Sequence, residues 1–454
     1  MMIAIRLTAT VAAAVIFMGV AAQAGGAGFA LIENSASGQG NAYAGGAAIA
    51  DDPATIYFNP AGMTRLNDRE LTAAGHIISS RAKFKNEGST AATGGLLTGP
   101  NADGGTTSFV PNLYYVHPLD NDFTLGVGIT VPFGLTTEYD DDWVGRYFAV
   151  RSSVTTININ PSLGWRANEK LSLGAGLSLQ YIDVELTSAI DFGAVCAAQE
   201  AGGVLPPGTC GAIGANPQAL DGFADLRADN LSWGFNLGLL YEFSPRTRVG
   251  VAYRSQVKQN LEGKAKFTVP GAVSFLQAAN VFVNSDIKAG VDLPDTFSLS
   301  AYHELSGKVA VMADWTWTHW SNFNELRIKY ESSQPDSVTT ENWNDSNRYS
   351  LGINYQMNSK LKLRGGLAYD ETPVPNARHR TPRLPGNDRT WLSLGAGYVI
   401  SPRVSVDAGY THLFIDDAKS DHTYESSVPT LRHTLKGKYQ ASVDIFSAQL
   451  NWKF

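Results

Sequence analysis

Histidine is the side chain most often used for acid–base chemistry near neutral pH, and this chain has eight histidines. None stands in an H-x-x-x-H or G-x-S-x-G pattern, which would pair two metal ligands on a helix or expose a nucleophilic serine. They are scattered along the chain: His76, His117, His303, His319, His379, His412, His422 and His433. The sequence therefore favours a protein that is not an enzyme and uses neither a metal ion nor a cofactor. A hydrolase whose serine, histidine and acid meet only in the fold stays open as an alternative.

The chain has two cysteines, Cys196 and Cys210, in a segment rich in glycine and proline. They form no C-x-x-C pattern and have no histidine nearby, which disfavours a zinc or redox site. Closing a loop of about 15 residues would stabilise the folded chain by ~3 kcal/mol in the entropic account of disulfides. We therefore predict a local disulfide, which fits an oxidising compartment.

The first 24 residues have the pattern of a secretory signal peptide. Arg6 precedes an apolar core from Leu7 to Val20, and Ala22-Gln23-Ala24 is an A-x-A cleavage site. An uncleaved anchor helix is the alternative. The mean hydropathy of -0.12 excludes a polytopic helical membrane protein, and the net charge of -7 argues against a nucleic-acid partner.

After Leu66, apolar residues alternate with polar or small ones instead of recurring at helical spacing. The clearest runs are 171–181, 233–243, 361–370 and 446–454. A period of two places the apolar residues on one face of a strand. The opposite face is polar or small, so a closed sheet would enclose a wet or plugged interior.

Two kinds of connection, short and long, alternate along the chain between these runs. Short polar turns fall at His117–Asp122, Ala167–Lys170, Ser244–Thr247, Leu305–Lys308, Met357–Lys360 and Ser401–Arg403. Longer connections fall at 86–108, 134–152, 187–230, 268–294, 329–346, 371–388 and 416–434. Short turns at one end and long loops at the other are typical of a bacterial outer-membrane barrel. We predict an all-β fold, a transmembrane antiparallel β-barrel of about 14 strands over residues 67–454. A secreted soluble β-protein is the alternative.

Acidic residues gather in two of the long connections, at Asp140–Asp142 and Asp416–Asp417. A dedicated calcium site needs more ligands at fixed spacing. We expect solvated loop charge that divalent ions bridge to anionic headgroups, so outer-membrane lipid and lipopolysaccharide are the expected partners. The expected location is the outer membrane of a Gram-negative cell.

Residues 25–66 differ from everything that follows them. Glycines and prolines are too frequent there for a regular helix or strand. Apolar anchors such as Leu31, Tyr43 and Ile56 set the segment apart from a disordered linker. We predict a compact N-terminal hatch that lies in the lumen of the barrel.

Several segments resemble the FadL family of outer-membrane transporters for long-chain fatty acids and other hydrophobic molecules. The hatch resembles that of the family at Ala27–Leu31, Ser35–Gly38, Ala44–Asp52 and Asn59–Ala61, and the likeness continues through Phe133–Tyr139, Trp233–Gly238, Tyr253–Ser255, Asp370–Pro375 and Asp388–Ser393. The resemblance implies a monomeric fourteen-stranded barrel closed by its hatch. It also implies passive, ligand-gated uptake of hydrophobic molecules, with long-chain fatty acids as the leading substrate.

The resemblance also implies a route for the ligand. Family members bind ligand beside the hatch and release it sideways through the wall, at an inward kink of the third strand. By this likeness Phe29 would lie near the pocket, and Asn59, Pro60 and Ala61 would form the hatch face at the kink. The third strand here is Phe123–Val131, followed by Pro132, Phe133 and Gly134.

Proline chemistry supports a break at that point independently. Pro132 cannot donate to a strand ladder, and Gly126, Gly128 and Gly134 weaken pairing. A local gap between neighbouring strands is therefore expected. The alternative is that Pro132 simply ends the strand before its loop.

Basic residues on the lumen face could hold the carboxylate of a fatty acid. Strand parity places Arg254, Arg348, Lys362 and Arg364 there; the alternative is that they pair with acids such as Asp314. The segment Asn344–Asn347 lacks the lysine expected in the fatty acid transporters. Uptake of aromatic or alkane hydrocarbons, which need no basic partner, is therefore the rival function within the family, and a general hydrophilic porin is the rival outside it.

Overall fold

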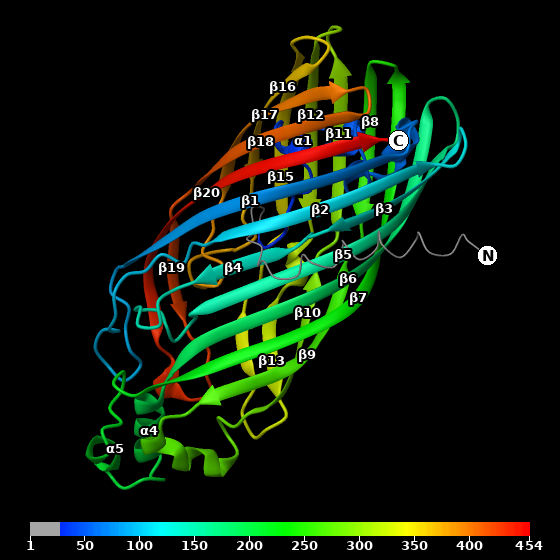
Figure 1. Cartoon of the computed structure of the whole chain (residues 1–454). Helices are drawn as coiled ribbons and strands as arrows, with labels where there is room; N and C mark the ends of the chain where they lie inside the picture. The colour runs from blue at the N-terminus through cyan, green and yellow to red at the C-terminus, as the bar shows by residue number, and fades with distance from the viewer. Residues whose placement is uncertain (1–27) are drawn as a thin grey trace, which may run out of the picture.

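The computed structural model describes residues 28–454, and the predicted signal peptide, residues 1–24, lies outside the described part. The chain forms a closed antiparallel barrel of 14 strands, as the sequence predicts. Its strands run obliquely around the barrel, and the C-terminus lies at the end opposite α4 and α5 (Figure 1). Within residues 28–454, no helix has the length and hydropathy needed to cross a membrane.

Some strands of the barrel are continuous and others are interrupted. The continuous strands are β1 (Glu70–Asn86), β2 (Thr107–Pro118), β5 (Arg151–Arg166), β6 (Leu171–Asp191), β7 (Asp221–Ser244), β16 (Leu361–Asp370), β17 (Arg389–Ser401) and β20 (Thr434–Lys453). The interrupted strands are β3 with β4 (Phe123–Thr130, Gly134–Glu138), β8 with β9 (Thr247–Arg254, Val257–Thr268), β10 with β11 (Ser285–Leu293, Thr296–Glu304), β12 with β13 (Val309–Thr318, Glu325–Tyr330), β14 with β15 (Ser337–Thr340, Ser346–Gln356) and β18 with β19 (Val404–Ile415, Ala418–Thr423). Pairing of β20 with β1, from Lys453 beside Glu70 to Gly437 beside Asn86, closes the barrel.

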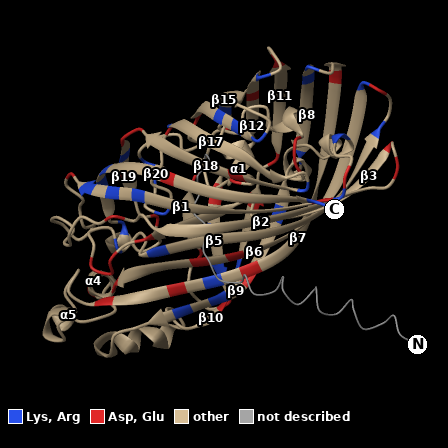
Figure 2. Cartoon of the chain, turned by 45° about the horizontal axis from the view of Figure 1, so that its top comes forward, with Lys and Arg blue, Asp and Glu red and all other residues tan. Residues whose placement is uncertain are grey.

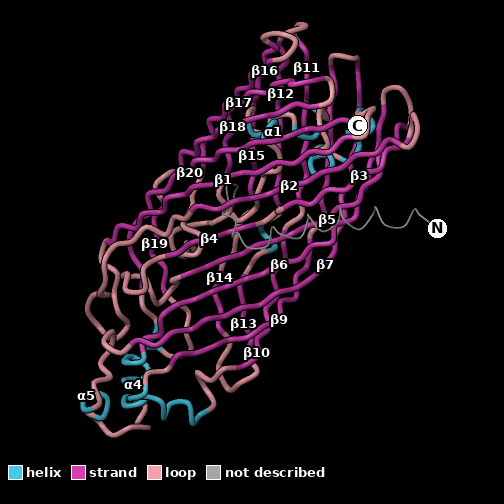
Figure 3. The backbone as a smooth tube through the Cα atoms, in the orientation of Figure 1, coloured by secondary structure: helices cyan, strands magenta, loops and turns pink. Residues whose placement is uncertain are grey.

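All the predicted short turns are confirmed, and they lie at the end that holds the C-terminus. The predicted long connections are present, but they are shorter than the sequence predicts. In place of a loop over 187–230, β6 runs to Asp191 and β7 starts at Asp221, and the predicted loops 134–152 and 416–434 contain β4 and β19. The strands continue past the part of the wall that carries alternating apolar residues. Their outer ends are mostly polar, so the alternation that predicts a strand is missing there. Figure 3 shows the remaining loops and the helices α4 (Phe192–Ala201), α5 (Thr209–Ala212) and η3 (Gly271–Ala279) at the end opposite the C-terminus.

The two faces of the wall differ as expected for a barrel in lipid. Outward-facing side chains such as Leu177, Trp233 and Leu351 are more than 60% exposed, whereas lumen residues such as Asn160 and Gln180 are buried. In Figure 2 the ribbon is mostly uncharged along β1 and β2, and charged residues colour the turns beside the C-terminus and the strand ends near α4. Short turns face the periplasm in such barrels, so the end with α4 is extracellular.

The hatch lies inside the barrel, as predicted. It contains α1 (Ala36–Gln39), α2 (Gly46–Ile49), α3 (Thr55–Phe58) and η2 (Pro60–Arg65). Its bonds reach different parts of the wall: Gln39 Nε2 donates to the Ile445 carbonyl (3.0 Å), and Asn59 Nδ2 to that of Leu239 (2.9 Å). Gly250 in the wall has no Cβ, and a Cβ at this position would collide with the Ala47 carbonyl oxygen. Wall glycines thus let the hatch backbone come close enough to fill the bore.

Candidate functional site

A large cavity opens among the extracellular loops; we call it the outer cleft. Its volume is about 450 Å³, and it extends from the loop helices to the top of the strands. Apolar side chains dominate its walls, including Val195, Leu205, Phe275, Leu276 and Val281. An apolar surface of this kind, in reach of the medium, can take up hydrophobic molecules.

The predicted disulfide between Cys196 and Cys210 is confirmed, and it ties α4 to α5 at one side of the outer cleft. Both sulfur atoms are buried in a cluster with Phe192, Val273 and Phe282. The helix η5 (Pro429–Leu431) packs against α4. The disulfide therefore braces one wall of the cleft.

A second cavity, which we call the apolar cavity, lies directly below the outer cleft. It measures about 100 Å³, and its lining includes Val154, Ile182 and Leu261. Leu186, Leu226, Leu326 and Ile328 line both cavities, so the two are adjacent. Only a few polar residues line the apolar cavity: Ser152, Glu341, Thr381 and Arg383. This composition suits a hydrocarbon chain.

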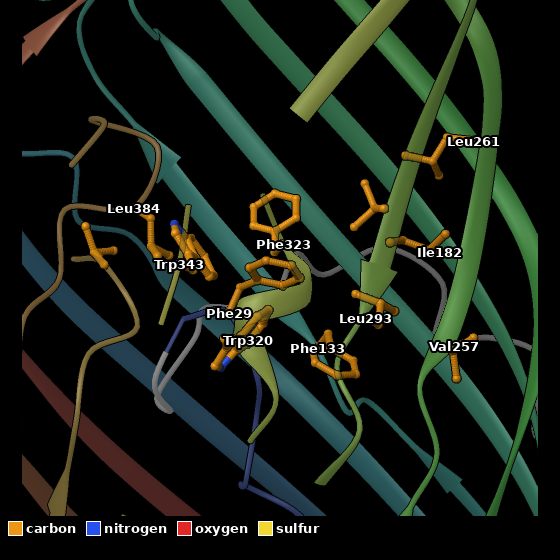
Figure 4. Close-up of a cluster of buried hydrophobic side chains, with 12 residues drawn as sticks. Phe29, Phe133, Ile182, Val257, Leu261, Leu293, Trp320, Phe323, Trp343 and Leu384 are labelled. Carbon is orange, nitrogen blue, oxygen red and sulfur yellow. The ribbon is translucent and has the colours of Figure 1, made fainter. Parts of the chain in front are cut away.

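Phe29 closes the floor of the apolar cavity together with other aromatic rings (Figure 4). Its ring centroid lies 4.9 Å from that of Trp320 and 6.0 Å from that of Trp343. Phe133 and Phe323 complete the set, with centroids 5.9 and 6.2 Å from that of Phe29. Trp320 is in the short helix η4 (Trp320–Asn322), which interrupts the ninth strand of the barrel. We call these five rings the aromatic floor.

The third strand is broken at the level of the aromatic floor. Its outer-leaflet part, β4, resumes at Gly134 after β3 stops at Thr130. Thr130 is opposite Asn158, and Gly134 is opposite Thr155. Four steps along the third strand thus match three steps along β5, so the break contains one extra residue. This bulge reverses side-chain parity, because Thr130 and Leu135 both face the lumen.

The hatch itself pairs with the broken strand. The Leu31 amide donates to the Pro132 carbonyl (2.8 Å), and the Gly134 amide donates to the Phe29 carbonyl (2.9 Å). The residues that form the floor are therefore bonded to the residues that form the break.

A seam separates the second and third strands next to the break. The ladder of β2 with β3 runs from Leu113 to Pro118, whereas β4 has a ladder with β5 and, among the described strands, none with β2. Pro111 of β2 and Pro132 of the break stand on opposite sides of this seam. Neither has an amide hydrogen to donate, so the sequence weakens the seam from both sides.

The Asn-Pro-Ala turn of the hatch is not where the sequence analysis places it. Asn59 is bonded to β7 through the Leu239 carbonyl, and a Cβ on Gly174 of β6 would collide with Pro60 and Ala61. The hatch face at the break is the extended segment from Phe29 to Leu31 instead. An extended backbone can pair with a broken strand, whereas the turn needs a glycine-rich surface to lie against.

A third cavity, of about 110 Å³, lies behind the segment Ala30–Ile32 and is more polar. Two of the predicted basic residues, Arg254 and Arg348, line it together with Asp314. Arg254 Nη2 donates to the Tyr57 carbonyl (2.9 Å), and Arg348 Nη2 donates to the Ala42 carbonyl (2.6 Å). Both arginines thus hold the hatch as well as lining a cavity beside it.

The other predicted basic residues are occupied by acids. Arg364 forms a buried ion pair with Asp407 (2.7 Å), and Lys362 binds Asp51 of the hatch (3.2 Å). Neither residue lines the polar cavity that contains Arg254 and Arg348. The structure thus brings two of the four candidates together and separates the other two.

Sequence reasoning missed most of the aromatic floor and the polar residues at the top of the apolar cavity. Trp320, Phe323 and Trp343 come from strand breaks, and Arg383 comes from the loop 371–388. The available signal was the run His319–Phe323, where aromatic residues interrupt the alternation of the preceding strand. Nothing in the local sequence marks Arg383 as a lumen residue.

A plugged barrel with apolar cavities from its extracellular loops to a break in its wall defines a class of protein, the outer-membrane channels for hydrophobic molecules. The chain belongs to the family described as outer membrane protein transport protein (OMPP1/FadL/TodX), whose sequence model matches residues 17–454. This confirms the resemblance seen in the sequence. The chain is an outer-membrane protein of a family that transports hydrophobic compounds.

Relatives agree over nearly the whole chain. Outer membrane protein P1 of Haemophilus influenzae is 32% identical over 95% of this chain and 96% of its own. The long-chain fatty acid transport protein of Escherichia coli O6:H1 is 31% identical over 87% of this chain and 88% of its own. The crystal structure of a Pseudomonas aeruginosa FadL homologue is 25% identical in sequence and has a TM-score of 0.85. The match covers 94% of this chain and 100% of the homologue.

Proposed function

We propose that this protein takes up long-chain fatty acids by passive, ligand-gated diffusion, that it acts as a monomer and that it is not an enzyme. The observation that carries the proposal is that the outer cleft adjoins the apolar cavity, whose lining includes Phe29 of the hatch and Leu135 beside the break in the wall. A relative named for long-chain fatty acid transport supports the choice of substrate. The chain supplies its own hatch, so one copy contains the whole route.

Energetics favour an apolar route over a water-filled one. Each CH₂ group that leaves water contributes about 0.8 kcal/mol, so a long acyl chain binds to an apolar lining rather than crossing a wet pore. We infer that the acyl chain leaves through the seam between β2 and β4 into the bilayer. This lateral exit keeps the hydrocarbon out of water at every step.

Gating follows from the bonds between the floor and the break. A ligand that fills the apolar cavity presses on Phe29, whose backbone is bonded to Gly134. Displacement of Phe29 would therefore loosen the seam and uncover the polar cavity behind it. Arg254 and Arg348 would then be within reach of the ligand carboxylate.

Uptake of labelled oleate tests the proposal. Cells that lack their own transporter should take up oleate in a saturable way when they make this protein, and excess toluene should compete weakly. Saturable toluene uptake without oleate uptake would favour the hydrocarbon alternative. Release of fatty acid from an ester by the pure protein would instead indicate a hydrolase.

We also propose a contact with the phosphate groups of lipopolysaccharide on the outer wall. Strand register places Lys438 of β20 beside both Lys85 of β1 and Lys419 of β19. Figure 2 shows basic residues on β19 and β20 at the end of the barrel that holds α4. Like charges directly opposite each other destabilise a sheet unless an anion lies between them. Asp417 meets only part of this charge, through Lys438 (3.0 Å).

The double variant Lys85→Glu/Lys419→Glu should therefore lose most of the lipopolysaccharide that co-purifies with the protein. Measurement of bound phosphate per barrel checks this expectation. The matched control is Lys308→Glu/Lys360→Glu, because both of those lysines are exposed in periplasmic turns. Equal lipid content in the two variants would refute the contact.

A further inference from the structure

We propose that Arg383 selects for carboxylates: it binds the acid group of an incoming amphiphile while the hydrocarbon chain lies in the apolar cavity below. This inference rests on the proposed function and names the residue that would make the channel prefer a fatty acid to a hydrocarbon. None of the basic residues predicted from the sequence lines the apolar cavity. Arg383 does, and it lines the outer cleft as well.

Arg383 is held in place from both sides. Its Nη1 donates to Ser152 Oγ (2.8 Å) in β5. The preceding residue, Pro382, accepts a hydrogen bond from the Tyr139 hydroxyl (2.8 Å). The next residue, Leu384, is buried among the side chains around the aromatic floor. The guanidinium is therefore fixed at the junction of the two cavities rather than carried on a flexible loop tip.

The positive charge of Arg383 lacks a close counterion. Within residues 28–454, no carboxylate oxygen lies within 4.0 Å of its nitrogen atoms. Arg364, by contrast, is paired with Asp407, and Arg254 and Arg348 donate to carbonyl groups of the hatch and lie in a different cavity. Burial lowers the pKa of Arg383 to about 10, which leaves it protonated at neutral pH.

Glu341 is the carboxylate residue that lines both cavities together with Arg383, and its contacts make it a poor counterion. Glu341 lines the same junction, but its Oε2 accepts a hydrogen bond from Trp343 Nε1 (2.8 Å). No ion pair within 4.0 Å joins Glu341 to Arg383. A partly dehydrated cation without a full partner gains strongly from an incoming carboxylate.

The surroundings of Arg383 separate the two ends of an amphiphile. Below it, the lining consists of residues such as Val154, Ile182 and Val184, down to Phe29. Ser152 provides a hydroxyl beside the guanidinium. An acid with a long chain would use both parts of the site, whereas an alcohol or a hydrocarbon of the same length would use only the apolar part.

The test compares oleate with oleyl alcohol, which has the same chain but no charge. Fluorescence titration of the full-length protein in lipid nanodiscs measures both affinities, using the tryptophans of the floor as the signal. Arg383→Gln should weaken oleate binding about tenfold to a hundredfold, the size expected for a lost charge-assisted hydrogen bond, and change oleyl alcohol binding less than about twofold. Arg383→Lys should recover part of the oleate affinity.

Arg378→Gln is the matched control, since Arg378 is an exposed arginine of the same loop. It should bind both ligands as the wild type does, and thermal unfolding should show that all variants keep their fold. Equal losses for oleate and oleyl alcohol, or undiminished oleate binding, in Arg383→Gln would overturn the Arg383 assignment alone. Failure of the wild type to bind oleate would overturn the proposed function and this inference together.

Discussion

Deletion of residues 25–66 should convert the closed barrel into a steady ion-conducting pore. The hatch fills the bore, and bonds such as Asn59 Nδ2 to the Leu239 carbonyl (2.9 Å) join it to the wall. A barrel of this size without a plug approaches the porins, which leave an aqueous channel. We expect conductance in planar bilayers to rise on the order of a hundredfold, from rare brief openings to a stable level.

A less drastic variant separates loss of the plug from damage to the barrel. Arg248 donates from Nε and Nη2 to the carbonyls of Ala48 and Ile49 (both 2.6 Å), so Arg248→Met loosens the hatch without removing it. This variant should show more frequent openings at normal barrel stability. If the deletion variant assembles in the membrane and still conducts no better than the wild type, residues 25–66 are not the plug.

Removal of the single residue Pro132 should slow uptake strongly and leave the barrel intact. The third strand carries one residue more than β5 across its break, from Thr130 opposite Asn158 to Gly134 opposite Thr155. Deletion of one residue restores matched register, so β3 and β4 can join into one strand. Joining also replaces a proline with a residue that can donate across the seam to β2. We expect the rate of oleate uptake to fall at least tenfold while oleate binding persists.

Deletion of Thr93 is the control for the loss of one residue, because Thr93 is exposed in the loop between β1 and β2. Its uptake rate should match that of the wild type. Normal uptake by a Pro132-deleted barrel, with the closed seam verified by its structure, would exclude the seam as the exit.

The wall of the barrel could be predicted from sequence because lipid imposes a simple rule on it. Every outward position must be apolar, so strands such as β6 and β20 carry alternation that is visible without any neighbour. The same rule predicts the turns and indicates a plug, since a polar lumen face has to be filled or hydrated. The Cys196–Cys210 disulfide could also be predicted from the sequence, because the two cysteines lie 14 residues apart in one loop.

The site resisted prediction because it is built where that rule stops. Trp320 and Trp343 stand in strand breaks, and Arg383 reaches the lumen from a loop that folds inward. Which strands border a break depends on register, and one extra residue at Pro132 is invisible without the partner strand. Arg364 and Arg254 have the same lumen parity, yet one meets Asp407 and the other meets the hatch. Strand parity predicts which face of the strand a side chain lies on, but it does not predict which residue that side chain contacts inside the barrel.

The most direct measurement of the route is the position of the cargo inside the wall. A fatty acid with a photoreactive group near its methyl end, bound to the full-length protein in nanodiscs and illuminated, can be located by mass spectrometry of its adducts. Lateral release predicts adducts on both sides of the seam, at Val110–Asn112 of β2 and at Val131–Leu135. Adducts confined to the periplasmic face of the hatch, around Asp51, Asp52 and Arg65, would mean that the cargo leaves along the axis of the barrel, and would contradict the account.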